Sequence, residues 1–338
     1  MDTYCWIHST FSIPTRWTGV QGIDIPHAGV APEADLALDS PGLLLGDPNQ
    51  YAVPQSERKY HKYYQWVCFM LFLQAVMFYI PRYIWKSSEG GKVRMLVGYL
   101  HENLMLTTDQ KRNQISVIVK YFKLHRGTHF PYALRFFVCE FLNFINVIGQ
   151  LYFIDVFLDY EFSKYGIEVI NYSGMEGEDR PDPMAKVFPK VTKCTFHKYG
   201  PSGTIVKHDG LCVLPINIIN EKIYIFIWFW LVALAAVTAA SLVYRIAVIM
   251  GPGIRATIIS AKGGKSTKPQ DVEEILELAS LTFFERLGDW FLLNLMCRNL
   301  NSLLVNDLIK QLRKEEKCDN STNVTTETLR LESESASI

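Results

Sequence analysis

The chain has 338 residues, 49% of them hydrophobic, and its 34 basic residues balance its 34 acidic residues. This zero net charge provides no basic bulk surface, so nucleic acid is excluded as an expected partner. The seven cysteines are an odd number and too few for a dense disulfide scaffold. Apolar blocks alternate with polar ones along the chain, and these blocks indicate its organisation.

Residues 1–62 form a polar segment that we expect to be loop-like. Its prolines are spaced too closely for long helices, at Pro14, Pro26, Pro32, Pro41, Pro48 and Pro54. Its first 50 residues contain no basic segment followed by an apolar core, so no secretory signal peptide is predicted. Cys5 lies in the aromatic segment CWIHSTF, which could form a short packed segment.

A charge-free run of 18 residues, Tyr63–Ile80, comes next. It is near the lower length limit for a helix that crosses a bilayer, and aromatic residues flank both of its ends. Pro81 and Arg82 close it, and we predict a membrane helix over residues 63–83. A buried helix of a soluble core is the alternative, which the longer apolar run further along the chain weakens.

Residues 84–133 are polar and basic, and we predict them to be a cytoplasmic loop. Basic segments between spans favour the cytoplasmic side. Within this loop, Thr108 is expected to cap a helix whose apolar stripe consists of Ile115, Ile118, Val119 and Phe122.

A further apolar run, Phe136–Ile154, predicts a membrane helix over residues 134–157. Four polar residues in it fall within an arc of about 120° at 100° per residue: Glu140, Asn143, Asn146 and Gln150. One interpretation is a water-lined pathway. The other, which we favour, is hydrogen bonding between helices inside a bundle.

Residues 158–222 are predicted to form an extracellular loop rich in Gly, Pro and Lys. This loop contains a glycosylation sequon headed by Asn171. It also contains four residues at a spacing that zinc ligands can have: Cys194, His197, His208 and Cys212. Because thiols outside the cell oxidise, we favour a disulfide here over zinc.

The longest apolar run is Ile223–Tyr244, which has 22 residues without a charge. At a rise of 1.5 Å per residue, such a helix crosses the roughly 30 Å core of a bilayer. Tyr224, Trp228 and Trp230 lie near one end and Tyr244 marks the other, as interfacial aromatic residues do. Soluble helices rarely stay apolar all round for six turns, so we predict a membrane helix over residues 223–245.

Residues 246–313 are predicted to form a cytoplasmic helical domain. Asp271 and Glu274 have the spacing of a capping box, and apolar stripes follow them. Residues 314–338 are rich in Ser, Thr and Glu and are predicted to be a disordered tail. The sequons of Asn320 and Asn323 in this cytosolic tail should carry no glycan.

The fold class that follows is an all-α integral membrane protein, a helical bundle with three predicted spans. The segment Gly264–Ser266 has the residues that end a phosphate-binding loop, but Ile259 stands where that motif needs glycine. Glu140 alone is no active site, and no nucleophile with a base and no paired carboxylates appear in the predicted spans. We therefore expect no enzymatic activity, no cofactor and no metal site.

Several motifs together resemble those of the innexins, the gap-junction proteins of invertebrates, and the similarity is to insect innexin-2-like members. The signature YYQWV consists of Tyr63, Tyr64, Gln65, Trp66 and Val67. Further similar segments are CWIHSTF at Cys5–Phe11, RYIWKSSEGG at Arg82–Gly91, FFVCEFLNFINVIGQ at Phe136–Gln150, DPMAKVFPKVTKCTFHKYGPSG at Asp182–Gly203, LCVLPINIINEKIY at Leu211–Tyr224 and GDWFLL at Gly288–Leu293. The resemblance covers most of residues 1–310.

The resemblance implies four membrane helices and two extracellular loops that each carry two cysteines. Met1–Cys5 is similar to the middle of the first of these loops, so residues 1–62 are expected to be a remnant of it. The N-terminal segment, the first membrane helix and one loop cysteine are then expected to be lacking. The family's pairing between loops implies a disulfide between Cys5 and Cys194, which leaves Cys212 outside that bond.

The function that the resemblance implies is a gap-junction channel subunit that passes ions and small molecules between adjacent cells. Its expected partners are other innexins in a homo- or hetero-oligomer, a hemichannel of the apposed cell and membrane lipid. The expected location is the gap junction of the plasma membrane. Two alternatives stay open: an unpaired hemichannel, and a non-conducting truncated subunit that modulates full-length innexins.

Overall fold

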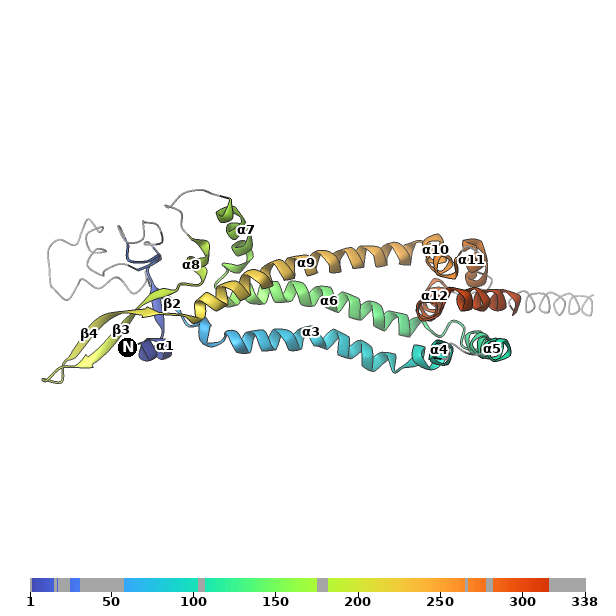
Figure 1. Ribbon diagram of the computed structural model, residues 1–338, viewed down its shortest axis with the longest axis horizontal. Coiled ribbons are helices and arrows are strands. Elements are labelled where there is room, and N and C mark those ends of the chain that lie inside the picture. The colour runs from blue at the N-terminus through green and yellow to red at the C-terminus, as the bar shows by residue number, and fades with distance from the viewer. Residues whose placement is uncertain are drawn as a thin grey trace, which may run out of the picture. The chain divides into compact units, whose positions relative to one another are not determined.

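The computed structural model describes residues 2–14, 17, 25–30, 58–102, 107–174, 182–264, 267–277 and 282–315. Three helices in this part of the chain are long and apolar enough to cross a membrane: α3 (Val67–Glu89), α6 (Phe130–Phe157) and α9 (Ile216–Met250) (Figure 1). The prediction of a mostly helical membrane protein is thus confirmed.

The ends of these helices differ from the predicted ones. Helix α9 begins seven residues before residue 223, because charged side chains of its first turns have partners. The carboxylate of Glu221, almost fully buried, pairs with Lys190 at 3.0 Å and with Lys222 at 2.7 Å. Helix α3 begins at Val67 rather than at residue 63, because Tyr63–Gln65 form a separate 3-10 helix, η3.

The chain divides into two compact units, and both contain parts of all three long helices. Unit 1 consists of Met1–Met77 and Ile145–Ala236, and unit 2 consists of Phe78–Phe144 and Val237–Ile338.

Unit 1 contains an antiparallel sheet of four strands in the order β2-β1-β3-β4. Its strands are β1 (Thr10–Ser12), β2 (Lys59–His61), β3 (Val191–Tyr199) and β4 (Ile205–Val213). The hairpin β3–β4 aligns Val191 with Val213 at its base and Tyr199 with Ile205 at its turn (Figure 1). The described part of this unit also contains the short helices α1 (Asp2–His8), α7 (Phe162–Ser173) and α8 (Pro183–Val187), besides η3. The sequence pattern does not predict this sheet.

Unit 2 packs short helices around one apolar cluster. These helices are α4 (Lys92–Glu102), α5 (Thr108–Leu124), α10 (Pro252–Gly263), α11 (Pro269–Glu277), α12 (Phe283–Arg298) and a helix over residues 302–315. The apolar stripe predicted for the helix after Thr108 is buried in this cluster. The predicted cap is off by one residue: Thr107 accepts from the backbone N–H of Gln110, because the side chains of these two residues form a reciprocal capping box.

The motif GDWFLL at the centre of α12 joins distant parts of unit 2. Gly288 lies against the backbone of His129 and Phe130, where a Cβ atom has no room. The carboxylate of Asp289 accepts hydrogen bonds from His129 Nδ1 at 2.7 Å and from the backbone N–H of Gly127 at 2.9 Å. Trp290 Nε1 donates to the carbonyl of Arg255 at 3.0 Å.

Asp271 is not the cap of α11 that its spacing predicts. The helix begins at Pro269, so Asp271 lies inside the first turn. Its carboxylate instead pairs with Arg313, which also contacts Glu274 at 2.8 Å. The predicted disordered tail and the sequons of Asn320 and Asn323 lie outside the described residues.

Candidate functional sites

Three cysteines of unit 1, Cys5, Cys194 and Cys212, meet at the base of the hairpin β3–β4. Cys5 of α1 forms a disulfide with Cys194 of β3, and their Cα atoms are 5.6 Å apart. This bond joins residues that are 189 positions apart in the sequence. It is the pairing that the family resemblance implies. Cys212 of β4 is a buried thiol in the same cluster, together with Tyr64 and Leu214.

The signature YYQWV holds the start of α3 against this disulfide region. The Tyr64 hydroxyl donates to the carbonyl of Trp6 at 3.2 Å. Gln65 Nε2 donates to the carbonyls of Trp6 at 2.6 Å and of Ile7 at 3.3 Å. Since α1 ends at His8, Gln65 satisfies carbonyls in the last turn of that helix, which have no donors of their own.

The other signature residues have separate roles. The Tyr63 hydroxyl donates to the carbonyl of Val187, at the end of α8, at 3.1 Å. Val67 is buried as the first residue of α3, whereas Trp66 is 59% exposed. The motif therefore ties α1, α8 and α3 together, and leaves one large aromatic side chain for an external contact.

Aromatic side chains near the start of α9 are more buried than interfacial residues would be. Tyr224 is fully buried, and its ring stacks on that of Phe188 at 5.3 Å between centroids. Trp228 lies against Gly166 of α7, at a position where a Cβ atom would collide with the indole. The prediction that these two side chains face the membrane interface is wrong, because α7 and the segment after α8 cover them. Trp230, 57% exposed, remains available for that role.

His61, in β2, is buried in unit 1. Its Nε2 atom shares a hydrogen bond with the hydroxyl oxygen of Ser12, at 2.7 Å. Burial is the main cause that lowers the pKa of His61 to about 4, and nearby Lys59 lowers it further, while Asp159 opposes the change. The imidazole is therefore neutral at pH 7.

The hairpin β3–β4 presents apolar side chains to the outside of unit 1, both near its turn and near its base. The exposed ones are Tyr199, Ile205, Val206, Leu211 and Val213. Exposed apolar groups in one hairpin are typical of a contact surface for another protein. His197 and His208 lie in the same hairpin, but Cys194 is in the disulfide and within the described residues no group of three metal-ligating side chains is present.

Asn146 and Gln150 of α6 form a hydrogen-bonded chain to α3. Pro81 in α3 has no N–H, so the carbonyl of Met77, four residues earlier, loses its helical donor. Asn146 Nδ2 supplies a donor to that carbonyl at 3.2 Å, and Gln150 Nε2 donates to Asn146 Oδ1 at 3.3 Å. In a bilayer, a neighbouring helix must satisfy such a carbonyl because water is absent.

Glu140 makes a different connection, from α6 to α9. Its carboxylate forms a two-pronged ion pair with Arg245, with Arg245 Nε 2.7 Å from Glu140 Oε2. The guanidinium also lies over the rings of Phe136 and Phe137. Asn143 is exposed and lines a cavity of about 370 Å³ with Glu140. The four polar residues of α6 therefore form two pairs: Asn146 and Gln150 bond to each other and to α3, and Glu140, which pairs with α9, shares a cavity with Asn143.

Asn171 lies near the end of α7 and is exposed, as is Ser173, the third residue of the sequon. The asparagine side chain is therefore accessible in this structure.

Comparison with known proteins identifies the family of this chain. The family model described as Innexin matches residues 1–316. The chain belongs to the innexin family. The protein named innexin inx2 from Drosophila melanogaster is 47% identical over 315 residues, which cover 93% of this chain and 79% of that protein.

Further innexins are similar over the same length. Innexin inx2 from Schistocerca americana is 47% identical, over 93% of this chain and 80% of that protein. Innexin shaking-B from Drosophila melanogaster is 39% identical, over 92% of this chain and 77% of that protein.

Innexins are gap-junction channel proteins and not enzymes, and they are multi-pass proteins of the plasma membrane. Family members form homo- and hetero-oligomeric channels. This innexin is thus a gap-junction channel subunit.

Proposed function

We propose that this innexin passes ions and small molecules between adjacent cells as part of an oligomeric channel. The observation that carries the proposal is the exposure of its long helices. In each long helix, few residues of the most apolar 18-residue stretch are buried by the chain itself. The buried share of this stretch is 22% in α3, 22% in α6 and 11% in α9. Apolar helices with so little cover require lipid and neighbouring subunits around them.

The orientation that we propose places the disulfide region outside the cell. Disulfides persist in oxidising compartments, which supports an extracellular position for Cys5 and Cys194. The basic residues of segments 84–133 and 246–313 support the opposite side for those segments. The apolar side chains of the hairpin β3–β4 would then dock on a hemichannel of the apposed cell.

The experiment is a measurement of junctional conductance between two cells that express this chain and no other innexin. The proposal expects a current between the cells. It also expects that Leu211→Glu on the hairpin abolishes this current, while Lys207→Glu on the same strand, an exposed position that is already charged, leaves most of it.

Both variants must reach the cell surface at equal levels, which surface biotinylation measures. Absence of junctional current from the unchanged chain, with altered current when a second innexin is present, would support the modulator instead and contradict the proposal.

An unpaired channel that opens to the medium is a second candidate, and the exposure of Asn171 favours it. A glycan on Asn171 would lie on the proposed extracellular side of the protein and would obstruct docking to the apposed hemichannel. Treatment with an N-glycosidase should shift the mobility of the unchanged chain but not of Asn171→Gln. If Asn171→Gln has the same gel mobility as the unchanged chain and does not increase the junctional current, this candidate is contradicted.

A further inference from the structure

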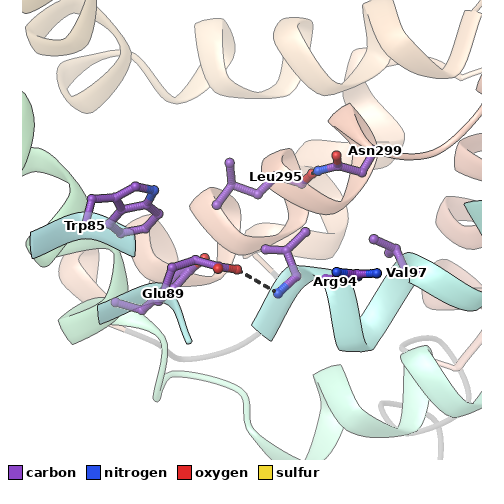
Figure 2. A pocket seen from close by; sticks show the side chains of 9 residues that line it. Trp85, Glu89, Arg94, Val97, Leu295 and Asn299 are labelled. Carbon is purple, nitrogen blue, oxygen red and sulfur yellow. Dashed lines mark hydrogen bonds between the residues drawn. The ribbon is translucent and has the colours of Figure 1, made fainter. Parts of the chain in front are cut away.

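Unit 2 contains a cavity of about 450 Å³ that the contacts described above do not use. Figure 2 shows side chains around it, among them Trp85 and Glu89 from α3, Arg94 and Val97 from α4, Leu295 from α12 and Asn299, which directly follows α12. Its volume lies within the range of small-molecule sites, roughly 300 to 1,000 Å³.

A buried hydroxyl without a partner lies in the wall of this cavity. Tyr132 of α6 lines the cavity and is only 5% exposed. Its hydroxyl has no hydrogen-bond partner within the described part of the chain. Because buried polar groups are nearly always hydrogen-bonded, this hydroxyl indicates that a group from outside the chain completes the site.

The charged side chains of the cavity suggest what that group is. Both carboxylate oxygens of Glu89 accept backbone hydrogen bonds, from Gly91 at 2.9 Å and from Val93 at 3.2 Å. These bonds hold a negative charge in a fixed position beside the indole of Trp85, and an ammonium group is attracted to both. Arg94 provides a positive charge in the same wall, and guanidinium groups bind phosphate well.

The position of the cavity indicates where this ligand comes from. Trp85 also lines the 370 Å³ cavity between α3, α6 and α9, together with Leu242. The first cavity therefore begins where the apolar stretch of α3 ends, and tryptophan at such an end is typical of the headgroup level of a bilayer.

We propose that this cavity binds a phosphoethanolamine group, the headgroup of phosphatidylethanolamine. The phosphate lies between Arg94 and the Tyr132 hydroxyl, which donates to it, and the ammonium group lies between Glu89 and Trp85. A soluble phosphoethanolamine carries the same chemistry, and the experiment distinguishes the two sources.

The test uses the full chain, purified in detergent and stripped of lipid, with binding measured by native mass spectrometry. The probes are phosphatidylethanolamine, phosphatidylglycerol, which lacks the ammonium group, and soluble phosphoethanolamine. We expect phosphatidylethanolamine to bind about tenfold more tightly than phosphatidylglycerol, since an ammonium–carboxylate bond is charge-assisted. Tighter binding of the lipid than of the soluble compound assigns the site to the membrane, and the reverse assigns it to a cytosolic phosphoester.

Two conservative variants test the assigned side chains. Tyr132→Phe removes only the hydroxyl, and Arg94→Gln removes only the charge; each should weaken binding of the preferred probe about tenfold. Arg112→Gln, at an exposed position of α5 outside the cavity, makes the same charge change and should not weaken it. Thermal unfolding of all three variants checks that the fold is kept. The proposal would be overturned if Tyr132→Phe and Arg94→Gln bound the preferred probe as tightly as Arg112→Gln does. It would also be overturned if the unchanged chain bound both lipids equally tightly.

Discussion

Units 1 and 2 contain portions of the same three long helices but are stabilised in different ways. Unit 2 buries a large apolar cluster, and hydrogen bonds such as that between Asp289 and His129 lie within or beside it. In unit 1, a disulfide and side-chain bonds to backbone carbonyls join α1, β3 and η3 around a cluster of five buried residues, and a separate group of aromatic side chains such as Phe188 and Tyr224 is buried beside α7.

The difference shows which kind of stabilisation suits each structure. A four-stranded sheet with an exposed hairpin has little apolar surface to bury, so a covalent bond between distant residues replaces part of a core. A cluster of amphipathic helices has one buried stripe per helix and needs no such bond. Unit 1 should therefore respond to oxidation state and pH, while unit 2 should respond mainly to changes of side-chain volume.

The largest expected effect is the loss of the disulfide. Cys5→Ser should lower the free energy of unfolding of unit 1 by about 4 kcal/mol, because the bond closes a long loop in the unfolded chain. Hydrogen-exchange mass spectrometry should show faster exchange in β3 and β4 and little change in α12. Cys68→Ser, which removes an exposed thiol from the same unit, is the control and should change neither. Equal acceleration in α12 would show that the two units unfold together.

The next effect concerns pH and His61. Its pKa is about 4 in the folded chain and near 6.5 when unfolded, so below pH 6.5 the unfolded state binds a proton that the folded state does not. Unit 1 should therefore lose stability as pH falls from 6.5 to 4, by up to about 3 kcal/mol at 1.36 kcal/mol per pKa unit. Hydrogen exchange of β1 and β2 against pH measures this loss. His61→Gln should flatten the profile over that range; an unchanged slope would assign it to other groups.

In unit 2, the expected sensitivity is to volume at Gly288. Gly288→Ala places a Cβ atom against the backbone of His129 and Phe130, which cannot move as a side chain can. We expect a loss of about 2 kcal/mol in the free energy of unfolding of unit 2. Gly253→Ala in α10 is the matched control, since nothing lies within 4 Å of its added Cβ atom. If thermal unfolding shifts equally for both variants, close packing at Gly288 is not the cause.

The smallest effect tests the bond between Asn146 and the carbonyl of Met77. Asn146→Ala should destabilise the packing of α3 and α6 by about 1 kcal/mol. In a Pro81→Ala background the restored N–H can serve the same carbonyl, so Asn146→Ala should cost less there. A double-mutant cycle on thermal unfolding measures this coupling. Strict additivity of the two changes would contradict the role assigned to Asn146.

The three long helices and the family follow from the amino-acid sequence alone. Runs such as Ile223–Tyr244 are apolar over a length that suits a bilayer, and this property depends only on neighbouring residues. The same is true of the signature Tyr63–Val67, because a motif is recognised without knowledge of what it contacts. The polar residues of α6 also indicated bonds between helices, although they did not reveal the partners of those bonds.

The contacts between groups far apart in the sequence become visible only in the folded chain. Gln65 satisfies carbonyls of α1, Asn146 compensates for Pro81, and Glu140 pairs with Arg245, at separations of up to 105 residues. The sheet was missed for the same reason: β1 and β2 have three residues each, too few to show a strand periodicity. The local residue pattern reflects the environment of one segment, such as lipid or water. A hydrogen-bond partner far along the chain is determined only when the segments pack together.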